Sequence, residues 1–294
     1  MARPLWFVEF LRKSYAKRVP IVKLTQLPLI GHIVERLLFK GDQSFFLPKD
    51  NVIQIQEDIP LPESTVLPSE VVDHFIEQAS HCWIMNACLC RQSNQCKDYP
   101  IELGCLFLGE AVLGINPKLG RLVSKEEAHE HVRRCREAGL VHMIGRNKID
   151  TVWLGIGPGD KLMTICNCCP CCCLWNTLPH MHPSISERFS RMPGVRVQVT
   201  EQCVGCGACL DEVCFVQAIH LENGLVVIDD NSCRGCGRCV EVCPQHAIEI
   251  TLADPRFAEQ TITHLAALVD ISGGGSVYKE QAPKAGASKT GTYR

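Results

Sequence analysis

The stretch Cys203-Val-Gly-Cys206-Gly-Ala-Cys209 is repeated 30 residues later as Cys233-Arg-Gly-Cys236-Gly-Arg-Cys239. Each copy is followed by one more cysteine and a short apolar segment, Cys214-Phe-Val-Gln-Ala-Ile219 and Cys243-Pro-Gln-His-Ala-Ile248. Three thiols spaced by two residues can surround one small object, and the intervening glycines let the loop close tightly around it. The repeat therefore predicts two similar loops that each bind an inorganic group.

Two further features bear on this region. Asn223-Gly224 lies between the two copies and is flanked by apolar residues, which predicts a hairpin turn between two strands. Zinc is the alternative metal for the same cysteines. Zinc sites usually pair two Cys-x2-Cys units across a longer loop, and a third cysteine after two more residues, present twice, does not fit that pattern.

Over Val195–Leu252 the sequence resembles the bacterial ferredoxins that bind two [4Fe–4S] clusters. In that family the fourth cysteine of each run ligates the other cluster. The resemblance implies one cluster held by Cys203, Cys206, Cys209 and Cys243, and a second held by Cys233, Cys236, Cys239 and Cys214. The first run departs from the family pattern, because four residues separate Cys209 from Cys214 and Phe215 stands where proline is usual. The extra residue is expected to tilt Cys214.

The whole chain has 20 cysteines in 294 residues. Met1–Leu11 has only a short apolar run, broken by Glu9 and followed by no small-residue cleavage site, so no secretory signal is expected. The cysteines are therefore interpreted as ligands in a reducing, cytoplasmic compartment and not as a disulfide scaffold. The 30 basic and 32 acidic residues nearly balance, so nucleic acid is not expected as a partner.

Ten more cysteines form two groups in the middle of the chain. In an extended segment, residues two apart share a face. This predicts that Cys166, Cys168 and Cys172 point one way and that Cys169, Cys171 and Cys173 point the other. A strand with thiols on both faces can contact two cofactors, or a cofactor and a partner. The ten candidate metal ligands are Cys88, Cys90, Cys96, Cys105, Cys166, Cys168, Cys169, Cys171, Cys172 and Cys173.

This central region resembles a family of multi-cluster iron–sulfur proteins of anaerobic microbes, in which a Cys-x-Cys-Arg…Cys…Cys segment precedes an Ile-Cys-Asn-Cys-Cys segment and a ferredoxin module follows. The resemblance covers about residues 62–252 and implies one or two additional [4Fe–4S] clusters, with structural zinc as the alternative. Arg91, directly after Cys90, either stabilises the reduced form of a cluster or pairs with an acid at the surface. Cys82 and Cys135 stand apart and are expected in the core.

Residues 1–40 carry eight basic and two acidic residues, interleaved with Trp6, Phe7, Phe10 and Tyr15. Such a segment either docks onto an anionic membrane surface or a partner subunit, or packs its apolar side onto its own domain. No stretch reaches about 18 uncharged apolar residues, so no span across a membrane is expected. The protein is placed in the cytoplasm, either free or peripheral at the inner face of the membrane.

The fold class expected is α+β, with a pseudo-two-fold ferredoxin module in which two antiparallel hairpins and two helices enclose the clusters. Helices are expected over residues 66–82 and 124–138. The expected domains are a basic amphipathic arm (1–60), a Cys-rich α/β domain (61–190), the ferredoxin module (195–252), a helix (253–271) and a disordered tail (272–294).

No acid–base pair, nucleophile or nucleotide fingerprint stands out in the sequence. The function expected is therefore electron transfer, as a protein or complex subunit that relays single electrons between a donor and a redox partner such as a flavoprotein or larger oxidoreductase. Two alternatives remain open. One is a reductase with an atypical central cluster that acts on a substrate, and the other is a cluster carrier or redox sensor.

Overall fold

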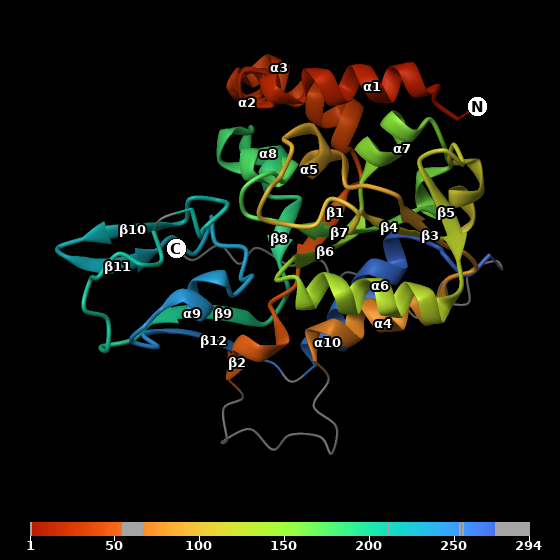
Figure 1. Ribbon diagram of the computed structural model, residues 1–294. Coiled ribbons are helices and arrows are strands. Elements are labelled where there is room, and N and C mark those ends of the chain that lie inside the picture. The colour runs from red at the N-terminus through yellow and green to blue at the C-terminus, as the bar shows by residue number, and fades with distance from the viewer. Residues whose placement is uncertain (1, 55–66, 211, 253, 255, 274–294) are drawn as a thin grey trace, which may run out of the picture.

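The computed structural model (Figure 1) describes residues 2–54, 67–210, 212–252, 254 and 256–273. The chain is a mixture of helices and strands, as expected for an α+β protein. Nearly all of the tail expected at 272–294 lies outside the described residues.

A seven-stranded sheet forms the centre of the molecule, with strand order β5-β3-β4-β7-β6-β1-β8. Neighbouring strands are antiparallel except for β1 and β8, which run parallel. The strands are β1 (Gln43–Phe46), β3 (Cys82–Met85), β4 (Leu106–Leu108), β5 (Gly120–Val123), β6 (Val141–Arg146), β7 (Met163–Cys168) and β8 (Phe189–Arg191).

Helices cover both faces of this sheet (Figure 1). On one face lie α4 (Pro68–Gln78), α6 (Lys125–Glu137) and α10 (Phe257–Leu268), whose apolar side chains share one core with the sheet. The opposite face carries shorter helices: α1 (Leu5–Ser14), α2 (Arg18–Lys23), α3 (Pro28–Val34), α5 (Leu89–Ser93), α7 (Lys148–Leu154) and α8 (Pro183–Ser186). Alternate residues of the inner strands therefore enter different cores, as Leu106 and Phe107 of β4 do.

The helices expected over 66–82 and 124–138 are present as α4 and α6, but α4 ends at Gln78 and Cys82 already belongs to β3, while residue 66 lies outside the described residues. The Ser124 side chain caps α6 by accepting a hydrogen bond from the Glu127 N–H at 3.2 Å. Gly139 follows the helix with a φ of 75°, a left-handed conformation that suits a glycine stop. The helix expected over 253–271 corresponds to α10.

The ferredoxin module extends from one side of the central sheet (Figure 1). Strands β10 (Ile219–Glu222) and β11 (Leu225–Ile228) form the predicted hairpin, and Asn223 and Gly224 at its turn both have positive φ. A second sheet has the order β2-β12-β9 and contains β2 (Ile53–Gln54), β9 (Val195–Val199) and β12 (Ile248–Leu252). Strand β9 pairs in antiparallel fashion with β12, which lies at the other end of the module. Because the two strands are not consecutive in the chain, this pair is not the second hairpin that was expected.

The two copies of the repeat differ in their helical content. The second contains α9 (Arg238–Val242), whereas the described residues of the first form only a turn at 208–210. The extra residue before Cys214 accounts for the difference, because Glu212 takes a φ of 54° that a helix does not allow. The expectation of two helices is thus met in one copy only.

Within the predicted arm of residues 1–60, of which 55–60 lie outside the described residues, residues 43–54 form strands that pair with the rest of the protein. Phe45 and Phe46 of β1 are buried inside the central sheet, and β2 pairs with β12 of the module. This segment therefore ties the two sheets together.

The helices of residues 5–34 are anchored to the rest of the protein at a few points. Tyr15, at the end of α1, is buried and donates a hydrogen bond to the Cys172 carbonyl at 2.9 Å. Gly31 of α3 lies so close to the Thr25 carbonyl and the His182 ring that a side chain there would collide with both. In the part of the chain described, no helix is long and apolar enough to cross a membrane.

Candidate metal centres

The first module site is a cavity that brings together thiols from both copies of the repeat. Its lining includes Cys203, Cys206 and Cys209 of the first copy and Cys243 of the second, together with the apolar side chains of Val226 and Ile248. Burial and the neighbouring thiols, that of Cys243 first among them, raise the pKa of Cys209. We call this group the outer site, because Cys206 is exposed.

The second module site combines the other four cysteines, Cys214, Cys233, Cys236 and Cys239. Burial raises the pKa of Cys233 to about 11, and the thiols of Cys236 and Cys214 add to the effect. The same neighbours, together with burial, raise the pKa of Cys239. Cys214 therefore lies with the second run and Cys243 with the first, the crossed arrangement expected of a ferredoxin repeat. We call this group the inner site.

The two crossing cysteines have equivalent surroundings in spite of the extra residue in the first copy. The Ala218 N–H donates to Cys214 Sγ at 3.3 Å, and the Ala247 N–H donates to Cys243 Sγ at the same distance. Three residues after each cysteine, Gln217 and His246 both have positive φ. The extra residue between Cys209 and Cys214 is accommodated in the loop at Glu212. The tilt expected at Cys214 is therefore not seen.

These features suit [4Fe–4S] clusters. Each site offers four thiols in partly apolar surroundings and N–H donors to sulfur, which are the interactions that hold and tune such clusters. Gly205, with a φ of 66°, brings its loop so near the Gly224 carbonyl that a Cβ would lie 1.8 Å from that oxygen. The hairpin turn and the outer loop therefore require glycine where they meet.

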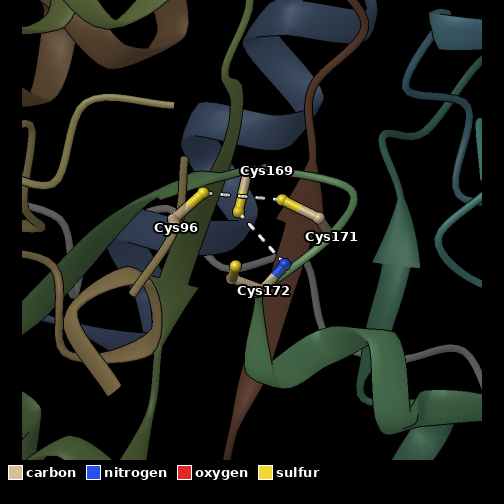
Figure 2. A group of neighbouring side chains, drawn as sticks. All are labelled: Cys96, Cys169, Cys171 and Cys172. Atoms are coloured by element: carbon tan, nitrogen blue, oxygen red, sulfur yellow. Dashed lines mark hydrogen bonds between the residues drawn. The ribbon is translucent and has the colours of Figure 1, made fainter. Parts of the chain in front are cut away.

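The ten central cysteines separate into two groups. In the first, the thiols of Cys96, Cys169, Cys171 and Cys172 all lie within 4.8 Å of one another (Figure 2). The Cys96 and Cys171 sulfurs are 3.7 Å apart, and the Cys172 N–H donates to Cys169 Sγ at 3.3 Å. We call this the four-thiol group.

The remaining six thiols form a chain of contacts on the other side of β7. Cys105 and Cys166 face each other across strands β4 and β7 with their sulfurs 3.8 Å apart. Electrostatic interactions between neighbouring thiols link Cys166 to Cys168, Cys168 to Cys173, Cys173 to Cys90, and Cys90 to Cys88. We call this the six-thiol group, with members Cys88, Cys90, Cys105, Cys166, Cys168 and Cys173.

The alternation predicted for residues 166–173 is therefore only partly right. Cys166 and Cys168 share a face, and Cys169 and Cys171 lie on the other, as expected. The positions of Cys172 and Cys173 are exchanged, because β7 ends at Cys168 and the chain turns at 170–172. A period of two applies only while the backbone stays extended.

Arg91 lies between the two central groups. Its side chain is fully buried and donates hydrogen bonds to the carbonyls of Asn167, at 2.8 Å, and Leu103. Burial opposes its charge, but the thiols of Cys88, Cys169 and Cys105 raise its pKa. Of the two roles predicted for this residue, the structure shows the position beside the thiols and not a surface ion pair.

Two residues near the thiols were not predicted. Arg238 of the inner loop donates to the Cys168 carbonyl at 2.7 Å and so joins the module to the central domain. Burial and the nearby Cys90 thiol raise the pKa of the Tyr15 hydroxyl, which places an N-terminal helix against the six-thiol group. The only sequence signal for Arg238 is its difference from Ala208, the matching residue in the first copy.

Comparison with known proteins supports the module. A family model described as a 4Fe-4S binding domain matches residues 226–249. A subunit of the ion-translocating oxidoreductase complex of Methanosarcina acetivorans is 46% identical over 48 residues, which are 16% of this chain and 18% of that protein. An uncharacterised ferredoxin, MJ0155, of Methanocaldococcus jannaschii is 41% identical over 49 residues, or 16% of this chain and 32% of the relative.

The chain thus matches less than a third of the length of either relative. No solved structure gives a significant match. Together, the sequence pattern, the paired thiol sites and these matches show that the chain contains an iron–sulfur ferredoxin module.

Proposed function

We propose that the protein is an electron-transfer subunit, or a free-standing carrier, that relays single electrons between a donor and a redox partner enzyme. Two [4Fe–4S] clusters, one at the outer and one at the inner site, would supply the one-electron chemistry. The ligands are Cys203, Cys206, Cys209 and Cys243 at the outer site, and Cys233, Cys236, Cys239 and Cys214 at the inner site.

The observation that carries this proposal is the contact between the inner site and the six-thiol group. Cys214, Cys233 and Cys236 pack against the same buried apolar cluster that contains Cys168 and Cys173. Arg238 adds a direct hydrogen bond across the boundary. A ferredoxin module that only shuttled electrons in solution would not need buried thiols on its inner side.

We further propose that the six-thiol group holds an additional iron–sulfur cluster. Within the described residues, no three of these thiols lie as close together as the members of the four-thiol group do. Six sulfurs spread along a line of contacts exceed the four ligands of one tetrahedral ion. They suit a centre in which different irons bind different thiolates.

The opposite end of this arrangement is open to a partner. Cys206 is exposed, and the neighbouring Val204 has 64% of its surface accessible. A redox protein can therefore approach the outer site directly. Membership of a larger complex is supported by the relative that is described as part of an ion-translocating oxidoreductase complex.

A redox titration followed by EPR on anaerobically purified full-length protein tests the relay. We expect at least three one-electron couples. The Cys168→Ser variant should lose one of them and keep the two that belong to the module. Cys82→Ala, which changes a buried cysteine outside all the thiol groups, is the matched control and should keep all three. Two couples that are both insensitive to Cys168→Ser would refute the additional cluster in the six-thiol group, and a protein with no one-electron couple would refute the electron-transfer function.

A further inference from the structure

We propose that the four-thiol group binds a single zinc ion and is a structural site distinct from the iron–sulfur centres. This goes beyond the electron-transfer function and does not depend on it.

The spacing of the sulfurs matches one small ion. A tetrahedral zinc ion with Zn–S bonds of about 2.3 Å places its sulfurs about 3.8 Å apart. The Cys96 and Cys171 sulfurs are 3.7 Å apart, and all four lie within 4.8 Å of one another. Figure 2 shows the four side chains gathered at one place between two loops.

A cubane cluster would need a wider arrangement. Each of its thiolates binds a different iron at a different corner of the cube, so the sulfurs lie farther apart than those on one ion. The outer and inner sites provide an internal comparison. Among the described residues, no three of their thiols lie within 4.8 Å of one another. The sulfur atoms are thus widely spaced at the outer and inner sites, where the sequence matches ferredoxins, and closely spaced in the four-thiol group.

The local charges also suit a zinc–thiolate centre. Four thiolates around Zn²⁺ carry a net charge of −2, which needs compensation if the site is partly buried. Cys169 and Cys172 are buried, and the positive charge of the buried Arg91 guanidinium interacts with the Cys169 thiol. The Cys172 N–H donates to the same sulfur.

The four ligands connect two loops that are far apart in the sequence. Cys96 follows α5, whereas the other three belong to the loop after β7. An ion here fixes the end of β7, the strand whose other face presents Cys166 and Cys168 to the six-thiol group. A closed set of four protein ligands is typical of structural and not catalytic zinc.

Zinc-edge X-ray absorption and metal analysis of the full-length protein, purified anaerobically from zinc-replete medium, test this proposal. We expect one zinc per chain with four sulfur neighbours at about 2.3 Å. The Cys171→Ser variant changes an exposed ligand and should lose zinc, or replace one sulfur by oxygen, while its iron content stays that of the parent. The control, Cys82→Ala, should match the parent in both metals.

Two results would overturn the zinc site. One is a parent protein without zinc, in which Cys171→Ser removes about four iron atoms, the content of one cubane. The other is zinc that keeps four sulfur neighbours in Cys171→Ser. The electron-transfer proposal is tested by the iron content and by the one-electron couples, neither of which depends on zinc. Failure of the zinc proposal therefore does not contradict it.

Discussion

At the scale of single residues, the two copies of the module differ most in charge. Arg234 and Arg238 of the second copy stand where the first has Val204 and Ala208. Both arginines are buried and donate to backbone carbonyls, and within the described residues neither forms an ion pair with a carboxylate. A cation beside a cluster stabilises the reduced form with its extra negative charge. The inner cluster is therefore expected to have the higher potential and to draw electrons inward.

The Arg238→Gln substitution tests this asymmetry, because glutamine keeps an amide donor for the Cys168 carbonyl and removes the charge. We expect the potential of the inner cluster to fall by tens of millivolts, where about 59 mV corresponds to a tenfold change in a one-electron equilibrium. EPR-monitored titration provides the measurement, and the potential of the outer cluster should stay in place. Arg196→Gln, at an exposed position of β9, is the control. If Arg238→Gln and Arg196→Gln shifted the potential of the inner cluster equally, Arg238 would have no specific effect on that potential.

At the scale of secondary-structure elements, the short helices of the first 40 residues have two different sides. Tyr15, Thr25, Gly31 and Phe39 are buried against the central domain. The side chains left exposed include ten large apolar ones: Leu5, Trp6, Phe10, Ile21, Leu24, Leu27, Leu29, Ile30, Ile33 and Leu37. Exposed basic residues accompany them, and the two acids, Glu9 and Glu35, are paired with arginines. An apolar surface with unpaired positive charge complements an anionic bilayer.

We therefore predict that the full-length protein binds phosphatidylserine-containing vesicles and that salt weakens the binding. Replacing Leu29, whose exposed fraction is 75%, by glutamate should lower vesicle partitioning about tenfold or more, since burying one leucine contributes about 1.5–3 kcal/mol. Co-sedimentation measures this. Leu122→Glu, at an exposed apolar position of β5, should bind as the parent does. The opposite outcome is a parent protein that does not bind vesicles but co-purifies with another protein, which the Leu29→Glu variant no longer retains. In that case this surface binds a partner subunit and not a membrane.

The elements also show how far the sequence predicts the structure. The hairpin at Asn223-Gly224 and the helices α4 and α6 depend on local signals, namely turn residues, caps and periodicity, and these are confirmed. The division of the ten central cysteines could not be predicted, because it depends on where β7 ends and on contacts with Cys96 and Cys105, which are distant in sequence. The sequence also did not predict that residues 43–54 form strands of the two sheets. Their pairing with β6 and β12 depends on tertiary structure and not on the composition of the segment.

At the scale of the whole molecule, the thiol sites follow one another from the surface inward. The outer site is accessible at Cys206, the inner site shares its apolar surroundings with Cys168 and Cys173, and the six-thiol group lies beneath Tyr15. The four-thiol group lies on the far side of β7. The ferredoxin module and the central domain thus form one continuous unit, in which the N-terminal helices cover the innermost thiols.

The most direct test of this account is the number of iron and acid-labile sulfide atoms per chain in anaerobically purified full-length protein. Two clusters in the module and one in the six-thiol group predict about 12 iron atoms with a matching number of sulfides, whereas the module alone predicts about eight. About eight iron atoms in fully loaded protein, with the six-thiol group free of iron, would contradict the proposal and reduce the molecule to a two-cluster ferredoxin with a metal-free or zinc-binding central domain.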